Sequence, residues 1–250
     1  MCAGSANPPR PFLTWTDIII ASATVLVGSM LQGSIGFGMG LFASPILVLI
    51  DPRFVPAPLL LATLVLTAVL GLRERHSIDV SGLSWAIAGR VPGTIVAATV
   101  LTVLPEEQTS AVFGALVLLG VAMSVSGVRL EPKHSVVFAA GMLSGIMGTI
   151  ASIGGPPMAL VHQHATGPRL RATLSAFFWF GTTLSLVALR VVGRFGAEEV
   201  RLTLIILPSL LAGTATSRWT SEIVDRGYTR AVVLTVSGLA GTVVIVRQLM

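Results

Sequence analysis

Several glycines lie close together in one short apolar segment. Because glycine has no side chain, the groups that this segment can present to a ligand are those of its backbone. The segment LQGSIGFGMGLFASP (31–45) contains Gly33, Gly36, Gly38 and Gly40. Glycine costs about 1 kcal/mol in a helix interior, yet it lets the backbone approach a small ligand closely. A helix interrupted here leaves unpaired N–H groups at the start of its second part, and these favour an anion. The segment therefore predicts an anion cradle made of backbone.

A second segment, GMLSGIMGTIASIGGPPMALV (141–161), repeats this pattern. A shift of 112 positions places Gly33 on Gly145, Gly36 on Gly148 and Pro45 on Pro157, with no gap. Two adjacent prolines remove two backbone donors and interrupt a helix. The alternative is that the glycines are helix-packing positions of the small-xxx-small kind, which suits Gly36 and Gly40 but not the sequence IGGPP. We interpret the pattern as an internal duplication in which each half opens with an interrupted helix.

The elements that must position these segments are membrane helices. Of the 250 residues 53% are hydrophobic and 11% are charged, whereas a soluble domain carries about 25% charged residues. Apolar segments lie at about 16–50, 54–72, 82–104, 108–128, 135–161, 172–192, 199–217 and 228–247. We expect an all-α polytopic protein in the lipid bilayer, at the bacterial inner membrane. Its expected parts are an N-terminal tail (1–15) and two homologous halves (16–130 and 131–250).

The charged residues narrow the function classes. All 11 carboxylates lie in loops or at segment ends, which argues against a cation transporter and against a carboxylate proton relay. Arg90 lies about nine residues into an apolar segment, where it could contact an anion or extend to the interface. The other basic residues are scattered among short loops, so we expect no nucleic-acid partner. His162 and His164 have no acid or cysteine nearby in sequence, so we expect no metal site and no cofactor.

These patterns select the candidate substrate-binding residues. Gln32 could donate a hydrogen bond to an oxyanion, and Phe37 flanks the first interruption. The set is Gln32, Gly33, Gly36, Phe37, Gly38 and Gly40 in the first segment, Gly145, Gly148, Ser152, Gly154, Gly155, Pro156 and Pro157 in the second, and Arg90 between them. No catalytic residue is expected.

Two membrane arrangements fit the segments. In one, each glycine-rich segment crosses the membrane once and the halves are parallel repeats. In the other, each segment turns back as a re-entrant hairpin and the halves are inverted repeats. Both arrangements place loops 73–79 and 129–134 in the cytoplasm, and the Lys and Arg counts do not separate them. We favour inverted repeats, because the arms on either side of the first interruption are each short for a full span.

The two motifs together resemble the sulfite exporter TauE/SafE family of membrane permeases. The resemblance rests on GSIGFGMGLFASPIL (33–47) and GIMGTIASIGGPPMAL (145–160), with support from RERHSIDVSGLSWAIAGRVPG (73–93) and RATLS (171–175). It covers about residues 16–247, and it implies export or uptake of sulfur-containing oxyanions such as sulfite or organosulfonates. It also implies that the functional site includes Gly33, Gly36, Phe37, Gly38 and Gly40 of the first motif, and Gly145, Gly148, Gly154, Gly155, Pro156 and Pro157 of the second.

We therefore predict a secondary transporter that holds a small anion at two interrupted helices near the membrane midplane. The alternatives are a channel or permease for another small organic anion and a membrane sensor or scaffold that transports nothing. An intramembrane enzyme is disfavoured, because the nearest serine motif, GMLSG (141–145), lacks the spacing of a rhomboid-like protease. Small-residue faces on several helices could support a homodimer.

Overall fold

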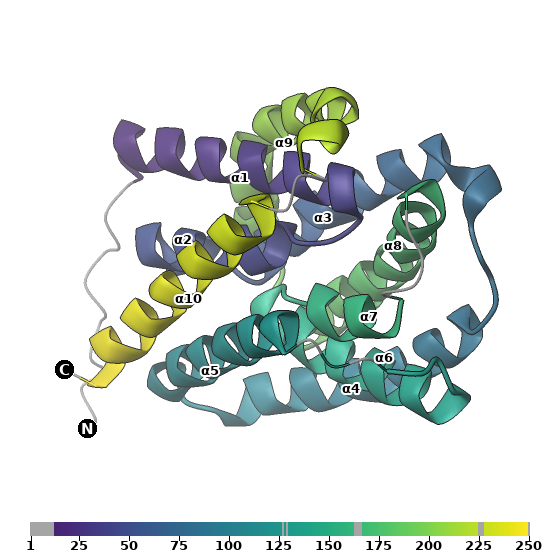
Figure 1. The fold of residues 1–250 in the computed structure, drawn as a ribbon. Coiled ribbons are helices and arrows are strands. Elements are labelled where there is room, and N and C mark those ends of the chain that lie inside the picture. Colours follow the sequence, from purple (N-terminus) through teal and green to yellow (C-terminus); the bar gives the residue numbers. More distant parts are fainter. Residues whose placement is uncertain (1–12, 127, 129, 163–166, 225–227, 250) are drawn as a thin grey trace, which may run out of the picture.

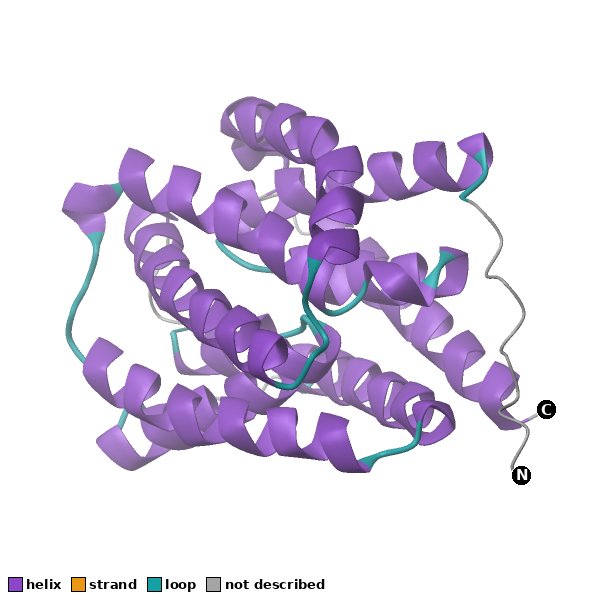
Figure 2. Ribbon diagram, turned by 180° about the vertical axis from the view of Figure 1, so that it is seen from behind, coloured by secondary structure: helices purple, strands orange, loops and turns teal. Residues whose placement is uncertain are grey.

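The computed structural model describes residues 13–126, 128, 130–162, 167–224 and 228–249, and in these residues it is built from helices without strands (Figures 1 and 2). The helices are α1 (Trp15–Ile35), α2 (Met39–Ile50), α3 (Ala57–Arg73), α4 (Leu83–Val103), α5 (Glu106–Val125), α6 (His134–Ala151), α7 (Gly155–Val161), α8 (Gly167–Val191), α9 (Ala197–Val224) and α10 (Tyr228–Leu249). Short 3-10 helices, η1 (Pro52–Phe54) and η2 (Arg75–Ser77), flank α3. The predicted all-helical fold is confirmed for this part of the chain.

Seven helices of the described residues are long and apolar enough to cross a membrane. They are Trp15–Ile35, Pro52–Arg73, Leu83–Val103, Gln108–Val125, His134–Ala151, Gly167–Val191 and Ala197–Trp219. Large apolar side chains such as Ile95, Val187 and Leu204 are exposed on them, as expected for a surface that faces lipid. Shorter apolar helices at Met39–Ile50 and Leu234–Val244 add to this set.

The long first apolar segment is divided between α1 and α2. Gly36 and Gly38 both have positive φ, 99° and 116°, which glycine adopts at little cost, and together they make the turn between the two helices. The Cα of Gly28 faces Met39 and Ala43, so α2 folds back along α1. We refer to residues 36–38 as the first turn.

The α6–α7 connection is built in the same way from different residues. Ser152 adopts the left-handed conformation with φ 61°, and Gly154 precedes the prolines at the start of α7. The hydroxyl of Ser144 donates to the carbonyl oxygen of Gly154 at 2.6 Å, so α7 also folds back towards α6. We refer to residues 152–154 as the second turn.

The closest helix contacts join the two predicted halves of the chain. α1 packs on α9 and α4 packs on α6, and Figure 1 shows these two pairs on opposite sides of the molecule, with α3 and α8 between them. α3 packs on α8, and α5 packs on α10. α5 ends at Val125 and α6 begins at His134, on either side of the predicted boundary at residues 130 and 131. That boundary between repeats stays a prediction.

Glycine lets the paired helices touch at their backbones. A Cβ added at Gly141 would run into the carbonyl of Ala86, and one added at Gly89 would run into that of Phe138. On the opposite side, Gly213 of α9 lies equally close to the carbonyl of Leu26 in α1. Small residues at such interfaces are how helices associate in a bilayer, where apolar burial gives little driving force.

Ion pairs between helices mark two ends of the molecule. The Glu74 end contains the end of α3, residues 74–82 and the start of α8, because Glu74 pairs with Arg171 and Asp79 with Arg169. The Asp51 end contains residues 51–58 and the loop between α8 and α9, because Arg53 pairs with Glu198. The Ser81 N–H and Arg169 hold the pKa of Asp79 below its usual value, so the Asp79 carboxylate is ionised at neutral pH.

Gly141→Ala should destabilise the protein, whereas Gly71→Ala should not. The added methyl group at Gly141 meets a backbone carbonyl that cannot yield, and overpacking of this kind costs about 1–3 kcal/mol. At Gly71 the nearest atom to a new Cβ is the Cβ of Ser175, an ordinary contact at 3.8 Å. The measurement is the melting temperature of each variant in detergent. Equal melting temperatures for the two variants would contradict the close contact between α4 and α6.

Candidate functional site

The two turns contact each other inside the bundle. The hydroxyl of Ser44 in α2 donates to the carbonyl oxygen of Ala151, the last residue of α6, at 2.5 Å. The Cα of Gly40 lies against the carbonyl group of Ser152, with no room for a side chain. The two glycine-rich motifs therefore lie side by side, whereas their origin by duplication stays a prediction.

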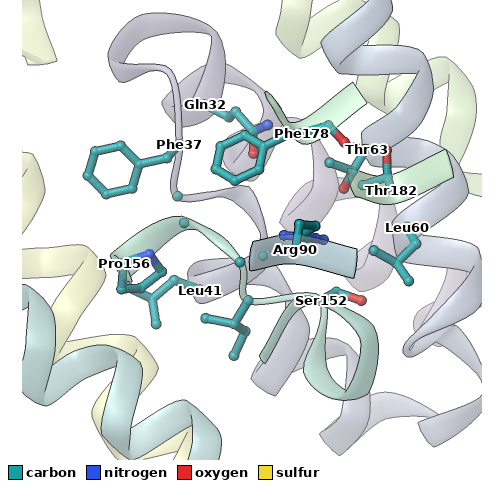
Figure 3. A pocket seen from close by; sticks show the side chains of 16 residues that line it. Gln32, Phe37, Leu41, Leu60, Thr63, Arg90, Ser152, Pro156, Phe178 and Thr182 are labelled. Carbon is teal, nitrogen blue, oxygen red and sulfur yellow. Dashed lines mark hydrogen bonds between the residues drawn. The ribbon is translucent and has the colours of Figure 1, made fainter. Parts of the chain in front are cut away.

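A cavity of about 30 Å³ lies at this junction, with room for about two water molecules (Figure 3). Ten of the predicted site residues line it: Gln32, Phe37, Gly38, Gly40, Arg90, Gly148, Ser152, Gly154, Gly155 and Pro156. The other lining residues are Leu41, Leu60, Thr63, Ile153, Phe178 and Thr182. That these residues bind a substrate stays a prediction.

Four predicted site residues do not line this cavity. Gly33 packs on Ser217 of α9, and Gly145 packs on the backbone of α4 near Thr94. Gly36 ends α1 and lies against the backbone of Arg171, while Pro157 is buried within α7. For Gly33 and Gly145 the contacts are those of helix packing, which was the alternative interpretation of the glycine pattern.

Arg90 is the one charged residue that lines the cavity, and its side chain is enclosed. Only 1% of Arg90 is exposed, so the guanidinium does not extend to an interface. Three glycines of different segments surround it: a Cβ at Gly148 would lie 2.7 Å from Nη2, one at Gly154 would lie 2.8 Å from Nη1, and one at Gly181 would lie 2.7 Å from Nε. The guanidinium therefore occupies space that only glycine leaves free.

The guanidinium of Arg90 has few interaction partners among the described residues. Nη1 donates to the hydroxyl of Ser144 at 2.7 Å, and the guanidinium lies 5.5 Å from the centre of the Phe177 ring. Nε is buried and has no hydrogen-bond partner among the described residues. A buried guanidinium with an unused donor has free capacity for an acceptor.

No carboxylate compensates Arg90 within the described part of the chain. The ion pairs there involve Arg53, Lys133, Arg169 and Arg171, and no Asp or Glu lines the cavity. An unpaired charge at membrane depth is costly and marks an ion or substrate pathway by default. The site therefore has an excess positive charge.

The two turns offer different numbers of backbone donors. α2 begins at Met39, and Gly38, Gly40 and Leu41 of its first turn line the cavity, where the first N–H groups of a helix have no helical acceptor. α7 has Pro156 and Pro157 in its first turn, so two of those donors are missing. The N-terminus of α2 is therefore the better donor of the two.

Two polar side chains complete the lining. Gln32 is buried at 4% exposure and lines the cavity. Ser152 carries the only positive φ among the described non-glycine residues, and its hydroxyl donates to the carbonyl oxygen of Pro56 at 3.1 Å. Such conformations persist where the surroundings hold them, and they gather at functional sites.

Some residues of α6 and α8 at the site were not among the predicted site residues. Ser144 holds Nη1 of Arg90, and Gly181 makes room for Nε. The signal available for Gly181 was its place in the middle of an apolar helix, where glycine is unfavourable without a packing reason. Phe178 and Thr182 line the cavity one helical turn apart on the same helix, and nothing in the sequence distinguished them.

In the described residues no three His, Cys, Asp or Glu side chains come together, and His164 lies outside them.

The fold and the site define a class: a multi-pass helical membrane protein with a buried, uncompensated cation where two interhelical turns meet. A family model described as sulfite exporter TauE/SafE matches residues 20–244, and the chain belongs to this family. No curated protein and no solved structure matched the chain. The resemblance noted in the two motifs is confirmed over nearly the whole sequence.

Gly181→Ala should destabilise the protein through Arg90 alone. The new methyl group would lie 2.7 Å from Nε, and because Gly148 and Gly154 enclose the guanidinium it cannot retreat, at a cost of about 1–3 kcal/mol. In an Arg90→Ala background the same substitution should cost far less. The measurement is a double-mutant cycle of melting temperatures in detergent. Additive effects would show that the two residues are not coupled.

Proposed function

We propose that this chain is a secondary transporter of small sulfur-containing oxyanions such as sulfite or organosulfonates. The observation that carries the proposal is the guanidinium of Arg90, buried at the junction of the two turns without a carboxylate among the described residues. A mobile counter-ion compensates such a charge only while it is bound, which is what a transport site requires. The family model supports the class of substrate, since it is described by sulfite export.

The donors around the cavity suit a compact oxyanion. Arg90 lines the cavity, and guanidinium groups bind the oxygen atoms of oxyanions through charge-assisted hydrogen bonds. The first N–H groups of α2 and the amide of Gln32 border the same cavity. We propose that these groups share the oxygen atoms of one anion, with Arg90 as the main ligand.

The small size of the cavity favours a carrier over a channel. A volume of about 30 Å³ is not a continuous pore, so an anion passes only if the walls move. A sensor or scaffold has no evident need for a buried, uncompensated guanidinium between two turns. We retain a channel or permease for another small organic anion as the second candidate, because apolar side chains such as Leu41 and Ile153 also line the cavity.

Inverted repeats would supply the required movement, and we propose that α1–α5 and α6–α10 are such repeats. Support comes from the packing partners: exchanging the halves turns the α1–α9 contact into the α6–α4 contact and returns α3–α8 and α5–α10 to themselves. Further support comes from α2 and α7, which each fold back along the preceding helix as a re-entrant hairpin would. Rocking one half against the other would then expose the site alternately.

The charged residues around the cavity also bear on how anion transport is driven. With no carboxylate lining the cavity in the described residues, we propose that an anion leaves down the membrane potential or carries its own proton as a symported acid. A dependence of transport on added sodium or a metal ion would contradict this.

The test is anion-dependent stabilisation of the purified protein in detergent, with sulfite, thiosulfate, sulfoacetate, sulfate, acetate and chloride. A ligand that binds only the folded state raises the melting temperature by mass action. We expect at least one sulfur oxyanion to stabilise the wild type and to lose this effect in Arg90→Gln, which removes the charge and keeps a polar side chain.

The matched control is Arg75→Gln, because Arg75 is exposed and its Nε contacts only the His76 ring. This variant should keep the full anion effect. An anion effect that survives in Arg90→Gln would remove the main support for the proposed site, and so would a well-folded wild type that no sulfur oxyanion stabilises. Flux into liposomes is the measurement that then separates transport from binding.

A further inference from the structure

α3 and α8 form an antiparallel pair through the bundle, one helix from each half of the chain. Near the Glu74 end, Gly71 of α3 faces Ser175 of α8. Towards the Asp51 end, Leu60 of α3 shares a buried cluster with Leu186 and Leu189 of α8. Both helices also line the central cavity, through Leu60 and Thr63 of α3 and Phe178 and Thr182 of α8. The distance between α3 and α8 therefore affects access to Arg90.

A buried ion pair ties the two helices together at the Glu74 end. Nη2 of Arg171 lies 2.6 Å from Oε1 of Glu74, and Nε of Arg171 lies 3.1 and 3.2 Å from the two carboxylate oxygens. The two side chains are only 15% and 11% exposed. The backbone of Arg171 also lies against Gly36, so this pair connects α3, α8 and the first turn.

The opposite end of the same helix pair opens onto a large cavity of about 800 Å³. Its walls include the start of α3, the residues after α8 and the start of α5, for example Ala57, Pro58, Gly193, Arg194 and Ser110. No ion pair joins α3 to α8 at this end among the residues that the structure describes. The two ends of one helix pair thus differ: a buried ion pair joins the helices at the Glu74 end, and a large cavity borders them at the Asp51 end.

Only a thin partition separates the large cavity from the central one. Ser152 lines the central cavity, and its hydroxyl donates to the carbonyl oxygen of Pro56, which lines the large cavity. Ile150 and Ile153, three residues apart, line the large and the central cavity respectively. The Arg90 site is therefore within one layer of residues of the Asp51 end.

Among the described residues, each end also has one more ion pair between the two halves of the chain. These two pairs are alike, so they do not explain the difference between the ends. Arg53, between α2 and α3, pairs with Glu198 near the start of α9, and Arg169, near the start of α8, pairs with Asp79 before α4. In each of these pairs one partner is at least 60% exposed, and exposed pairs contribute little. The buried pair of Glu74 and Arg171 is the contact that distinguishes the ends.

We propose that the ion pair of Glu74 and Arg171 is the gate that closes the Glu74 end, in a conformation whose central site is reached through the large cavity at the Asp51 end. This inference rests on the proposed transport function. Transport then requires the pair to separate as α3 and α8 move apart at the Glu74 end and approach each other at the Asp51 end. Arg171 transmits the movement to the first turn through its contact with Gly36.

The test is the accessibility of two engineered cysteines in the purified full chain. Cys2 is the only native cysteine, so Cys2→Ser gives a clean background. Ser34→Cys probes the Glu74 end, where Ser34 is 8% exposed and its carbonyl oxygen lies 3.5 Å from Nη1 of Arg171. Ser110→Cys probes the large cavity. The readout is the rate of labelling by a charged, water-soluble maleimide.

The gate variant is Glu74→Gln with Arg171→Gln, which removes both charges and leaves neither buried without its partner. With the gate intact, we expect Ser110→Cys to react at least 10-fold faster than Ser34→Cys. In the gate variant, Ser34→Cys should react at least 10-fold faster than before and Ser110→Cys should react more slowly. The matched control is Glu131→Gln, because the pair of Glu131 and Lys133 is 77% and 73% exposed and should not affect either rate.

Faster labelling of Ser34→Cys together with slower labelling of Ser110→Cys distinguishes gating from loosening of the fold. A gate variant in which both cysteines react faster is destabilised rather than switched, and that result would overturn the proposal, as would unchanged rates at both positions. Labelling needs no substrate, so these outcomes do not depend on which anion binds at Arg90. A failure of the anion experiment would therefore leave the gate result interpretable, and a failed gate would leave the anion site standing.

Discussion

A guanidinium held away from water without a carboxylate is the constraint on which the rest of this structure depends. Arg90 is enclosed by Gly148, Gly154 and Gly181, which come from α6, the second turn and α8. The guanidinium fills the space that a side chain would need at these three positions, so each of them is restricted to glycine. The second turn is held to the same group, because Ser144 accepts from Arg90 and donates to the carbonyl of Gly154.

The residues that enclose Arg90 come from the second half of the chain, whereas Arg90 itself belongs to the first half. Arg90 belongs to α4, whereas two of its enclosing glycines belong to α6 and α8. Backbone contacts at Gly89 and Gly141 keep α4 and α6 at a fixed distance, and Gly213 does the same for α9 and α1. Contacts of this kind leave little room for the paired helices to slide past each other.

Much of the fold and part of the site could be predicted from the sequence. Apolar segment lengths predicted helices, and glycine and proline located both turns, because these residues act on the backbone locally. Which side of a helix a glycine faces depends on its neighbours, so Gly33 and Gly145 were assigned to the site although they pack on other helices. Ser144 could not be found, since its role depends on a contact with Arg90, which is distant in sequence. For Gly181 the only signal was its place inside an apolar helix.

The two turns are unequal in the backbone donors that they offer to the cavity. The first turn leads into α2 with its N–H groups intact, whereas Pro156 and Pro157 remove donors from the start of α7. A site formed only from helix ends would therefore bind an anion from one side. Arg90 lies on the side of the second turn, against Gly154, and supplies there a full charge where the backbone offers least. The two similar motifs thus differ at the cavity, because one brings backbone donors and the other lies against a charged side chain of α4.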